Sequence, residues 1–275
     1  MKYILRNPER SFLKALPHLP KPIVALLTGP PGTGKTYFSE WLAHSTESRF
    51  LYLLLHQWST DEELVASANL YKLSTGKASC EEEAYNPGFL WNAANLSQSG
   101  KVVMCLDELD KASSRTEALM LRFLETGRVY SSNGCLLSEA NLENLIVIIT
   151  SNGARELLSP TIRRTYRMQF SHLPKAEEVS LLVDMGVRPG IAKILRDLAD
   201  ITRAASNGEH PSLPEMTRAA KALEGVKTPP EISCVLTSTM LRESDTDVRI
   251  VTQAANLIAA DMGRSTAKCD QSITP

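Results

Sequence analysis

Five short apolar runs constrain the fold of this chain more than any other feature. They read IVALLTG at 23–29, FLYLLL at 50–55, KVVMCLD at 101–107, NLIVIIT at 144–150 and, more weakly, YRMQF at 166–170. Such runs are typical of strands buried in a parallel sheet. Helical patterns separate them: GKTYFSEWLAHS after the first, TEALMLRFLETG after the third and ARELLSPTIRR after the fourth. The alternation predicts βαβ units and an α/β fold.

The pattern changes at about residue 174, beyond which no strand-like run occurs. Four segments, AEEVSLLVDMG, GIAKILRDLADITRAAS, PSLPEMTRAAKALEG and TDVRIVTQAANLIAADM, have helical periodicity, with Pro and Gly between them. We therefore predict two domains, an α/β domain at 1–172 and a small helical domain at 173–275.

Composition narrows the classes of protein that fit. The chain has 275 residues, 43% of them hydrophobic, and a net charge of -1, so binding to nucleic acid through bulk charge is disfavoured. Its five cysteines are scattered without C-x-x-C spacing, which argues against a disulfide framework or a zinc site. The N-terminus lacks the apolar core of a signal peptide, and no apolar run approaches the length of a membrane span. A soluble cytoplasmic protein is the expectation.

The segment GPPGTGKT matches G-x-x-x-x-G-K-[ST] between an apolar strand and a helix, the context that this motif requires. Its glycines let the backbone wrap around phosphates, and successive N–H groups at the helix N-terminus face the anion. Lys35 would contact the β- and γ-phosphates, and the Thr36 hydroxyl would bind Mg²⁺. The motif predicts binding of ATP and Mg²⁺. The expected binding residues are Gly29, Pro30, Pro31, Gly32, Thr33, Gly34, Lys35 and Thr36.

The third apolar run ends in two carboxylates, Asp107 and Glu108, within VVMCLDELDK. The carboxyl end of a central strand is where ligands bind in open α/β sheets. Asp107 would hold Mg²⁺ through water, and Glu108 would act as the base toward the attacking water. The alternative is a surface acidic turn that caps the next helix. The phosphate-binding motif at a suitable distance upstream favours the catalytic interpretation.

The fourth run ends in Thr150, Ser151 and Asn152. A side-chain amide at this position could orient the attacking water or sense the γ-phosphate. Ser and Asn are also common helix N-caps, and a cap would explain the segment taken by itself. In combination with the two preceding motifs, Asn152 becomes a candidate site residue.

The order of these motifs resembles that of an AAA+ ATPase, over roughly residues 20–260. GPPGTGKT resembles Walker A, LDELDK resembles Walker B and TSN resembles sensor 1. Three features resemble the MoxR-like branch, which is similar to dynein-related and McrB-type modules. They are DELDKA, an extra segment at about 59–92, and GRVYSSNGCLLSEANLENLIVIITSN, which resembles a short β-hairpin before the sensor 1 strand. The resemblance implies a P-loop ATPase domain with an insertion in helix 2, followed by a helical lid. The alternative for the insertion is an ordinary long surface loop.

Adjacent arginines, Arg163 and Arg164, precede the last apolar run. The resemblance implies that an arginine here reaches the ATP site of a neighbouring subunit and stabilises charge on the γ-phosphoryl group. Similar proteins often read RRRF where this chain reads RRTY, so the choice between the two remains open, with Arg164 preferred. The alternative is a solvated basic surface. A residue that acts on a neighbour requires an oligomer, and we expect a closed ring of about six subunits.

The segment HPSLPEMTRAA resembles the sensor 2 region, where an Arg near the start of a lid helix contacts the γ-phosphate of its own subunit. In many relatives that Arg follows the Ser by two residues, but here the position is Pro214. Arg218, one turn further on, is the candidate substitute. The alternative is that Pro211 and Pro214 start a helix whose Arg218 faces solvent.

Three functions are compatible with these motifs. The first is a ring-forming AAA+ ATPase that remodels or activates a partner protein, since MoxR-like relatives commonly act with a von Willebrand A-domain partner. The second is a nucleic-acid-directed motor or loader, disfavoured by the neutral charge and by the lack of a recognisable DNA-binding appendage, but left open. The third is a scaffold that binds ATP without turnover. The joint presence of Lys35, Asp107 and Glu108 argues against the third.

Overall fold

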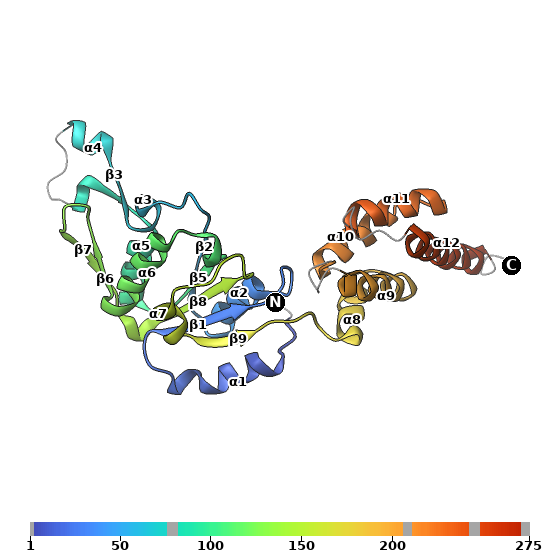
Figure 1. Ribbon diagram of the computed structural model, residues 1–275, viewed down its shortest axis with the longest axis horizontal. Helices are drawn as coiled ribbons and strands as arrows, with labels where there is room; N and C mark the ends of the chain where they lie inside the picture. Colours follow the sequence, from blue (N-terminus) through green and yellow to red (C-terminus); the bar gives the residue numbers. More distant parts are fainter. Residues whose placement is uncertain (1–2, 76–81, 206–210, 242–247, 271–275) are drawn as a thin grey trace. The chain divides into compact units, whose positions relative to one another are not determined.

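The computed structural model describes residues 3–75, 82–205, 211–241 and 248–270, shown as a ribbon in Figure 1. The chain divides into two compact units. The first consists of residues 1–29 and 34–170, and the second of residues 30–33 and 171–275.

The first unit is built on a five-stranded sheet with the order β2-β5-β8-β1-β9. Every pair of neighbouring strands is parallel. Five parallel strands and the α/β class were predicted from the apolar runs, and both are confirmed. The strands are β1 (Ile23–Thr28), β2 (Arg49–Leu54), β5 (Val102–Asp107), β8 (Leu145–Ser151) and β9 (Tyr166–Gln169).

Helices cover both faces of this sheet because side chains alternate along each strand. On β1, Val24 and Leu26 belong to the core that α5 and α6 complete, whereas Ala25 and Leu27 belong to the core that α1 and α2 complete. In Figure 1, α1 lies along β9. The covering helices are α1 (Asn7–Ala15), α2 (Lys35–Ser45), α5 (Phe89–Ser99) and α6 (Ser114–Thr126).

The helix α1 was not predicted from the sequence. It begins with Pro8 in its first turn, and the Glu9 carboxylate accepts hydrogen bonds from the backbone N–H and the guanidinium of Arg6. Phe12 is fully buried, with its ring centroid 5.2 Å from that of Tyr166. One apolar face over nine residues is a weak periodic signal, so tertiary packing decides this helix.

The predicted helix over ARELLSPTIRR, residues 154–164, is wrong for its first half. Helix α7 spans only Ser159–Arg163. Before it, the backbone N–H of Ala154 donates to Asp110 and that of Leu158 donates to Glu117. Buried carboxylates satisfy these backbone donors in place of a helical ladder.

Two small antiparallel hairpins extend the first unit. Within the predicted insertion at 59–92, β3 pairs with β4, and residues 76–81 lie outside the described residues. The pairing of β6 with β7 confirms the hairpin predicted before the fourth run. The elements concerned are α3 (Asp61–Leu64), β3 (Ala66–Ala68), α4 (Leu70–Thr75), β4 (Tyr85–Pro87), β6 (Arg128–Tyr130) and β7 (Leu136–Glu139).

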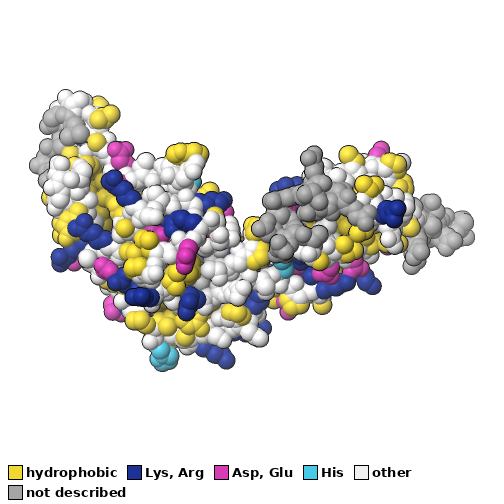
Figure 2. Space-filling view, in the orientation of Figure 1, with side chains coloured by type: hydrophobic (Ala, Val, Ile, Leu, Met, Phe, Trp, Pro, Cys, Tyr) yellow, Lys and Arg dark blue, Asp and Glu magenta, His cyan; other side chains and the backbone are white. Residues whose placement is uncertain are grey.

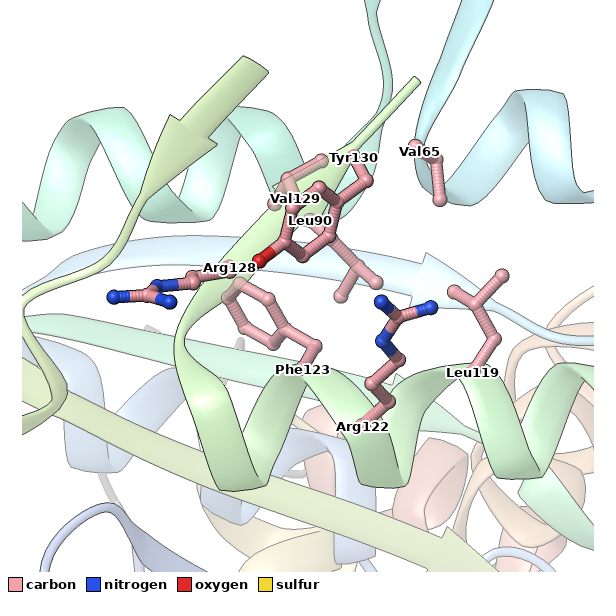
Figure 3. A pocket seen from close by; sticks show the side chains of 8 residues that line it. All are labelled: Val65, Leu90, Leu119, Arg122, Phe123, Arg128, Val129 and Tyr130. Carbon is pink, nitrogen blue, oxygen red and sulfur yellow. The ribbon is translucent and has the colours of Figure 1, made fainter. Parts of the chain in front are cut away.

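A small pocket marks the place where the insertion, α5, α6 and the β6–β7 hairpin meet (Figure 3). Its walls are mainly apolar, from Val65, Leu90 and Phe123. The Arg122 guanidinium lies 4.9 Å from the centre of the Tyr130 ring. This cation–π contact joins the hairpin to α6.

The second unit is helical in all of its described regular structure, as predicted. Its core consists of apolar side chains from all five helices. The buried Glu178 accepts hydrogen bonds from Arg203 at 2.9 and 3.2 Å and pairs with Arg196. In the described part of the chain, no helix has the length and apolar character needed to span a membrane. The helices are α8 (Lys175–Asp184), α9 (Pro189–Ala205), α10 (Leu213–Leu223), α11 (Pro229–Met240) and α12 (Val248–Asp270).

Candidate functional site

The predicted phosphate-binding loop connects β1 to α2 through a tight turn. Gly34 precedes α2 with φ 89°, a left-handed conformation that favours glycine. At Gly29, an added Cβ would meet the Phe170 carbonyl oxygen at 2.1 Å, so no side chain fits there. Thr33 Oγ1 donates to the Pro30 carbonyl at 2.9 Å. The backbone conformation at Gly34 and the close contact at Gly29 therefore explain why glycine occupies these two positions of the motif.

Lys35 begins α2 and is 6% exposed. Its Nζ donates to the Gly29 carbonyl at 2.8 Å, which folds the side chain back along the loop. Burial lowers the pKa of Lys35 to about 8, although the nearby Asp107, Asp110 and Glu108 act in the opposite direction. Because burial disfavours the charged ammonium group, an anionic phosphate at this position would stabilise it.

Thr36 and Asp107, the predicted Mg²⁺ ligands, lie side by side. The Thr36 hydroxyl is 3.0 Å from each carboxylate oxygen of Asp107. The Tyr52 hydroxyl donates to Asp107 Oδ2 at 3.0 Å, and the Thr150 hydroxyl donates to Oδ1 at 2.5 Å. Burial, followed by the charge of Asp107, raises the pKa of Tyr52. Three hydroxyl groups from three separate strands or helices thus orient one carboxylate.

Asn152 and Glu108 are also in direct contact, with Asn152 as the donor and Glu108 as the acceptor. Asn152 Nδ2 donates to Glu108 Oε1 at 2.8 Å, and Lys111 Nζ donates to Oε2 at 2.7 Å. Glu108 has φ 59°, which is unusual for a residue other than glycine. Its backbone N–H donates to the Thr150 hydroxyl at 2.9 Å. Contacts with the backbone N–H and with both carboxylate oxygens of Glu108 therefore keep its side chain beside Asn152.

The buried Asp110 fixes the backbone that carries Asn152. Its Oδ2 accepts the N–H of Asn152 at 3.1 Å and that of Ala154 at 2.7 Å. Asp110 is 2% exposed. Asp110 of the segment DELD is therefore buried and bound to the backbone after β8. A surface acidic turn, the alternative interpretation, would have left this carboxylate exposed.

Arg163 and Arg164 lie at the end of α7 and are exposed. Arg164 pairs with Glu125 of α6 at 2.5 Å. Both side chains are nearly half exposed, so this ion pair contributes little to stability. Among the described residues, no carboxylate lies within ion-pair distance of Arg163. Both guanidinium groups are accessible at the surface of the first unit.

Arg218 is an exposed residue of α10 in the second unit. Ser212 is the N-cap of this helix, with Glu215 completing a capping box and Pro214 in the first turn. These features explain where the helix starts, and Arg218 follows one turn later.

Tyr52 and Lys111 were not predicted as site residues, and Thr150 was not assigned a role. Tyr52 is the only residue with a polar side chain in the run FLYLLL. Its strand, β2, pairs with β5 so that Leu54 lies opposite Asp107, which brings Tyr52 within reach of that carboxylate. That single polar group was the available signal. Nothing in the order of residues indicated which strand would neighbour β5.

The residues present fit ATP and Mg²⁺. Lys35 is buried and follows a loop in which Gly29, Gly32 and Gly34 have positive φ, the kind of backbone that directs successive N–H groups toward an anion. Thr36 and Asp107 offer a hydroxyl and a carboxylate, the hard oxygen donors that Mg²⁺ takes together with substrate phosphates. The donor set therefore matches the predicted nucleotide and metal.

Comparisons with known proteins give a consistent family. A model of the AAA domain, dynein-related subfamily, matches residues 25–165, just over half of the chain. The ATP-binding subunit ClpL of an ATP-dependent Clp protease from Lactococcus lactis subsp. lactis is 25% identical over 211 residues, 66% of this chain and 26% of the relative. An ORC1-type DNA replication protein from Methanothermobacter thermautotrophicus is 26% identical over 179 residues, 64% of this chain and 43% of the relative.

A solved structure of a RuvB mutant from Thermotoga maritima aligns with a TM-score of 0.49 and 14% identity, covering 91% of this chain and 69% of that one. The chain spans less than half the length of the curated relatives described above. The family match confirms the resemblance to AAA+ ATPases that the motifs indicated. This chain belongs to the AAA domain family, in its dynein-related subfamily.

Proposed function

We propose that this chain is an ATP hydrolase that works in a ring of subunits and remodels or activates a partner protein, in the manner of MoxR-like chaperones. The observation that carries the proposal is the direct hydrogen bonding of two pairs of predicted site residues, Thr36 with Asp107 and Asn152 with Glu108. Lys35 directly precedes Thr36 at the start of α2. ATP is the substrate, and Mg²⁺ is the expected metal.

Each residue has a separate task in the proposed reaction. Lys35 holds the β- and γ-phosphates, while Thr36 and Asp107 hold Mg²⁺. The metal, when bound, supplies positive charge that offsets charge on the phosphates. Glu108 accepts the proton of the attacking water, and Asn152 keeps the Glu108 carboxylate in place. The products are ADP and phosphate, and the proton leaves through Glu108.

The arginines supply the argument for a ring. A guanidinium carries a permanent charge and a planar fork that matches phosphate oxygens. Arg163 and Arg164 are exposed on the first unit, where a neighbouring subunit could receive them. Repetition of this head-to-tail contact closes a ring, which we propose to contain about six subunits. Arg218 is proposed to contact the γ-phosphate in its own subunit.

A protein client is favoured over nucleic acid. On the face seen in Figure 2, Lys and Arg side chains are interspersed with acidic and hydrophobic ones and form no continuous basic band. The insertion carries Leu70 and Tyr71, which are 76% and 64% exposed. Exposed apolar side chains suit contact with a protein, such as a von Willebrand A-domain partner. Cytoplasmic location is part of this proposal.

The substitution Lys35→Met tests nucleotide binding. We expect the variant to lose all stabilisation by ATP and Mg²⁺, because it lacks the charge that contacts phosphate. Without nucleotide, it should be more stable than the wild type by about 1–3 kcal/mol at pH 7, since a pKa lowered to about 8 reports an unfavourable buried charge. Urea unfolding with and without ATP measures both effects.

The pH dependence of that difference follows from the direction of the shift. Folded wild type releases the Lys35 proton near pH 8, whereas the unfolded chain keeps it until about pH 10.4. The penalty is therefore fully present below pH 8 and disappears as pH rises toward 10.4. Native ATP affinity in Lys35→Met would refute the assignment of the phosphate-binding loop.

The nucleic-acid alternative is tested by adding duplex and single-stranded DNA to the ATPase assay at about 150 mM salt. We expect the rate to change by less than about twofold, because the chain has no basic excess. Stimulation of about tenfold or more, absent in Lys35→Met, would instead favour a motor or loader. The similarity to an ORC1-type DNA replication protein makes this control necessary.

A further inference from the structure

We propose that Glu117, a buried carboxylate of α6, is the residue that positions the arginine acting on the neighbouring subunit. This inference rests on the proposed function. Glu117 touches none of the phosphate-binding residues and was not singled out by any motif. Its role follows from three contacts that it makes with the segment carrying Arg163 and Arg164.

The two carboxylate oxygens of Glu117 bind different parts of that segment. Oε1 accepts the backbone N–H of Leu158 at 2.8 Å and the hydroxyl of Thr161 at 2.6 Å. Oε2 forms an ion pair with Arg155 at 2.7 Å. Glu117 is 0% exposed, and Thr161 is 2% exposed. The carboxylate is therefore desolvated: Oε1 accepts two hydrogen bonds, and Oε2 is balanced by the charge of Arg155 without the geometry of a hydrogen bond.

Helix α7 depends on this contact because it has little stability of its own. It has five residues, and the side chain of its N-cap, Leu158, makes no capping hydrogen bond. A helix this short does not persist through local interactions. A carboxylate at its first turn compensates the exposed backbone dipoles there. Glu117 thus performs the capping from another helix, and Arg163 ends the helix that it caps.

Arg155 extends the network to the turn behind the predicted catalytic base. Its Nε donates to the Ala112 carbonyl at 3.0 Å, and Nη2 donates to the Leu109 carbonyl at 3.4 Å. Leu109 directly follows Glu108 in the chain. The turn that carries Glu108 is therefore connected through Arg155 and Glu117 to α7. Through this connection, the position of the Glu108 turn in one subunit can affect the direction of the arginine that the same subunit presents to its neighbour.

Glu117→Gln is the test, because it keeps the size of the side chain and removes its charge. The Gln amide N–H₂ would face either the Arg155 guanidinium or the donors of Leu158 and Thr161, so one side of the network fails. We expect ATP to stabilise the variant as it does the wild type, while the ATPase rate falls at least tenfold. Displacement of a reacting group by about 1 Å can cost about 100-fold.

Mixing experiments distinguish a positioning role from a general structural defect. Glu117→Gln keeps an intact phosphate-binding loop and loses the presented arginine, whereas Lys35→Met has the opposite combination. In a random equal mixture, about one interface in four joins an intact loop to an intact arginine, so up to about a quarter of the wild-type rate should return. Mixing Glu117→Gln with the inactive arginine variant should restore nothing.

Two further variants keep the test decisive. Thr161→Val removes one of the three contacts and should show the same mixing behaviour with a smaller loss, about three- to tenfold. It carries the test if Glu117→Gln fails to fold. Thr116→Val, at a neighbouring buried position on α6 that hydrogen-bonds to Ser113 and Ser59, should keep its rate within about twofold.

The outcomes separate this inference from the function on which it rests. Full activity of Glu117→Gln, or rescue by the arginine variant instead of by Lys35→Met, overturns the role of Glu117. Loss of ATP binding in Glu117→Gln overturns it as well. If Arg163→Ala and Arg164→Ala are both fully active, the arginine acting in trans is itself refuted, whatever Glu117→Gln does.

Discussion

Glu108→Gln is expected to lower the rate of ATP hydrolysis by about 10²- to 10⁴-fold while ATP remains bound, the range that general acid–base groups contribute. Glutamine keeps the shape of the side chain and can still accept the hydrogen bond from Asn152. It cannot take a proton from the attacking water. The variant should therefore stay in the ATP-bound assembly for much longer than the wild type.

The measurement is single-turnover hydrolysis together with nucleotide retention after gel filtration. Glu139→Gln is the matched control, because Glu139 pairs with Arg128 on the exposed β6–β7 hairpin. The hydrolysis rate of this variant should stay within about twofold of the wild-type rate. Unchanged turnover in Glu108→Gln would make Glu108 a structural carboxylate. In that case its contacts with Lys111 and Asn152 would serve only to hold the turn.

Removal of the arginine that acts in trans is expected to have the largest effect, about 10³- to 10⁵-fold in hydrolysis rate. Arg163→Ala and Arg164→Ala are compared because the sequence leaves the choice open. The ion pair of Arg164 with Glu125 at 2.5 Å is half exposed, so Arg164 can leave it at little cost. The inactive variant should bind ATP normally, since its own phosphate-binding loop is intact.

The decisive measurement is the ATPase rate across mixing ratios with Lys35→Met after subunit exchange. Two inactive proteins should produce activity together, because some interfaces regain both halves of a site. Arg167→Ala is the control: Arg167 is an exposed residue of β9, three positions after Arg164, and its loss should change the rate by less than about twofold. A strictly monomeric preparation with the full wild-type rate would disprove action in trans.

Local features of the sequence were sufficient for the sheet and for the choice of the proposed site residues. The apolar runs specify buried strands because burial on both faces leaves no polar alternation. GPPGTGKT specifies its turn within eight residues, because Gly29 and Gly34 adopt conformations that other residues avoid. Asp107 ends β5 and Asn152 directly follows β8, and parallel strands bring such ends to one edge of a sheet.

Sequence periodicity failed where backbone groups find partners far away in the chain. Residues 154–158 have a helical pattern, yet the buried carboxylates of Asp110 and Glu117 take the N–H groups of Ala154 and Leu158. Those pairs are separated by more than 40 positions. A pattern read over a few residues contains no information on such contacts.

The sequence by itself determined the fold class, the order of the motifs and the chemical type of each site residue, because these depend on residues close together in the chain. Only the tertiary structure decided that Tyr52 and Thr150 share Asp107, that α1 covers one face of the sheet and that Glu117 caps α7. Each of these contacts depends on which strand or helix lies beside which. Close packing of the whole unit determines which elements are neighbours, because the side chains must fill the interior together without overlap.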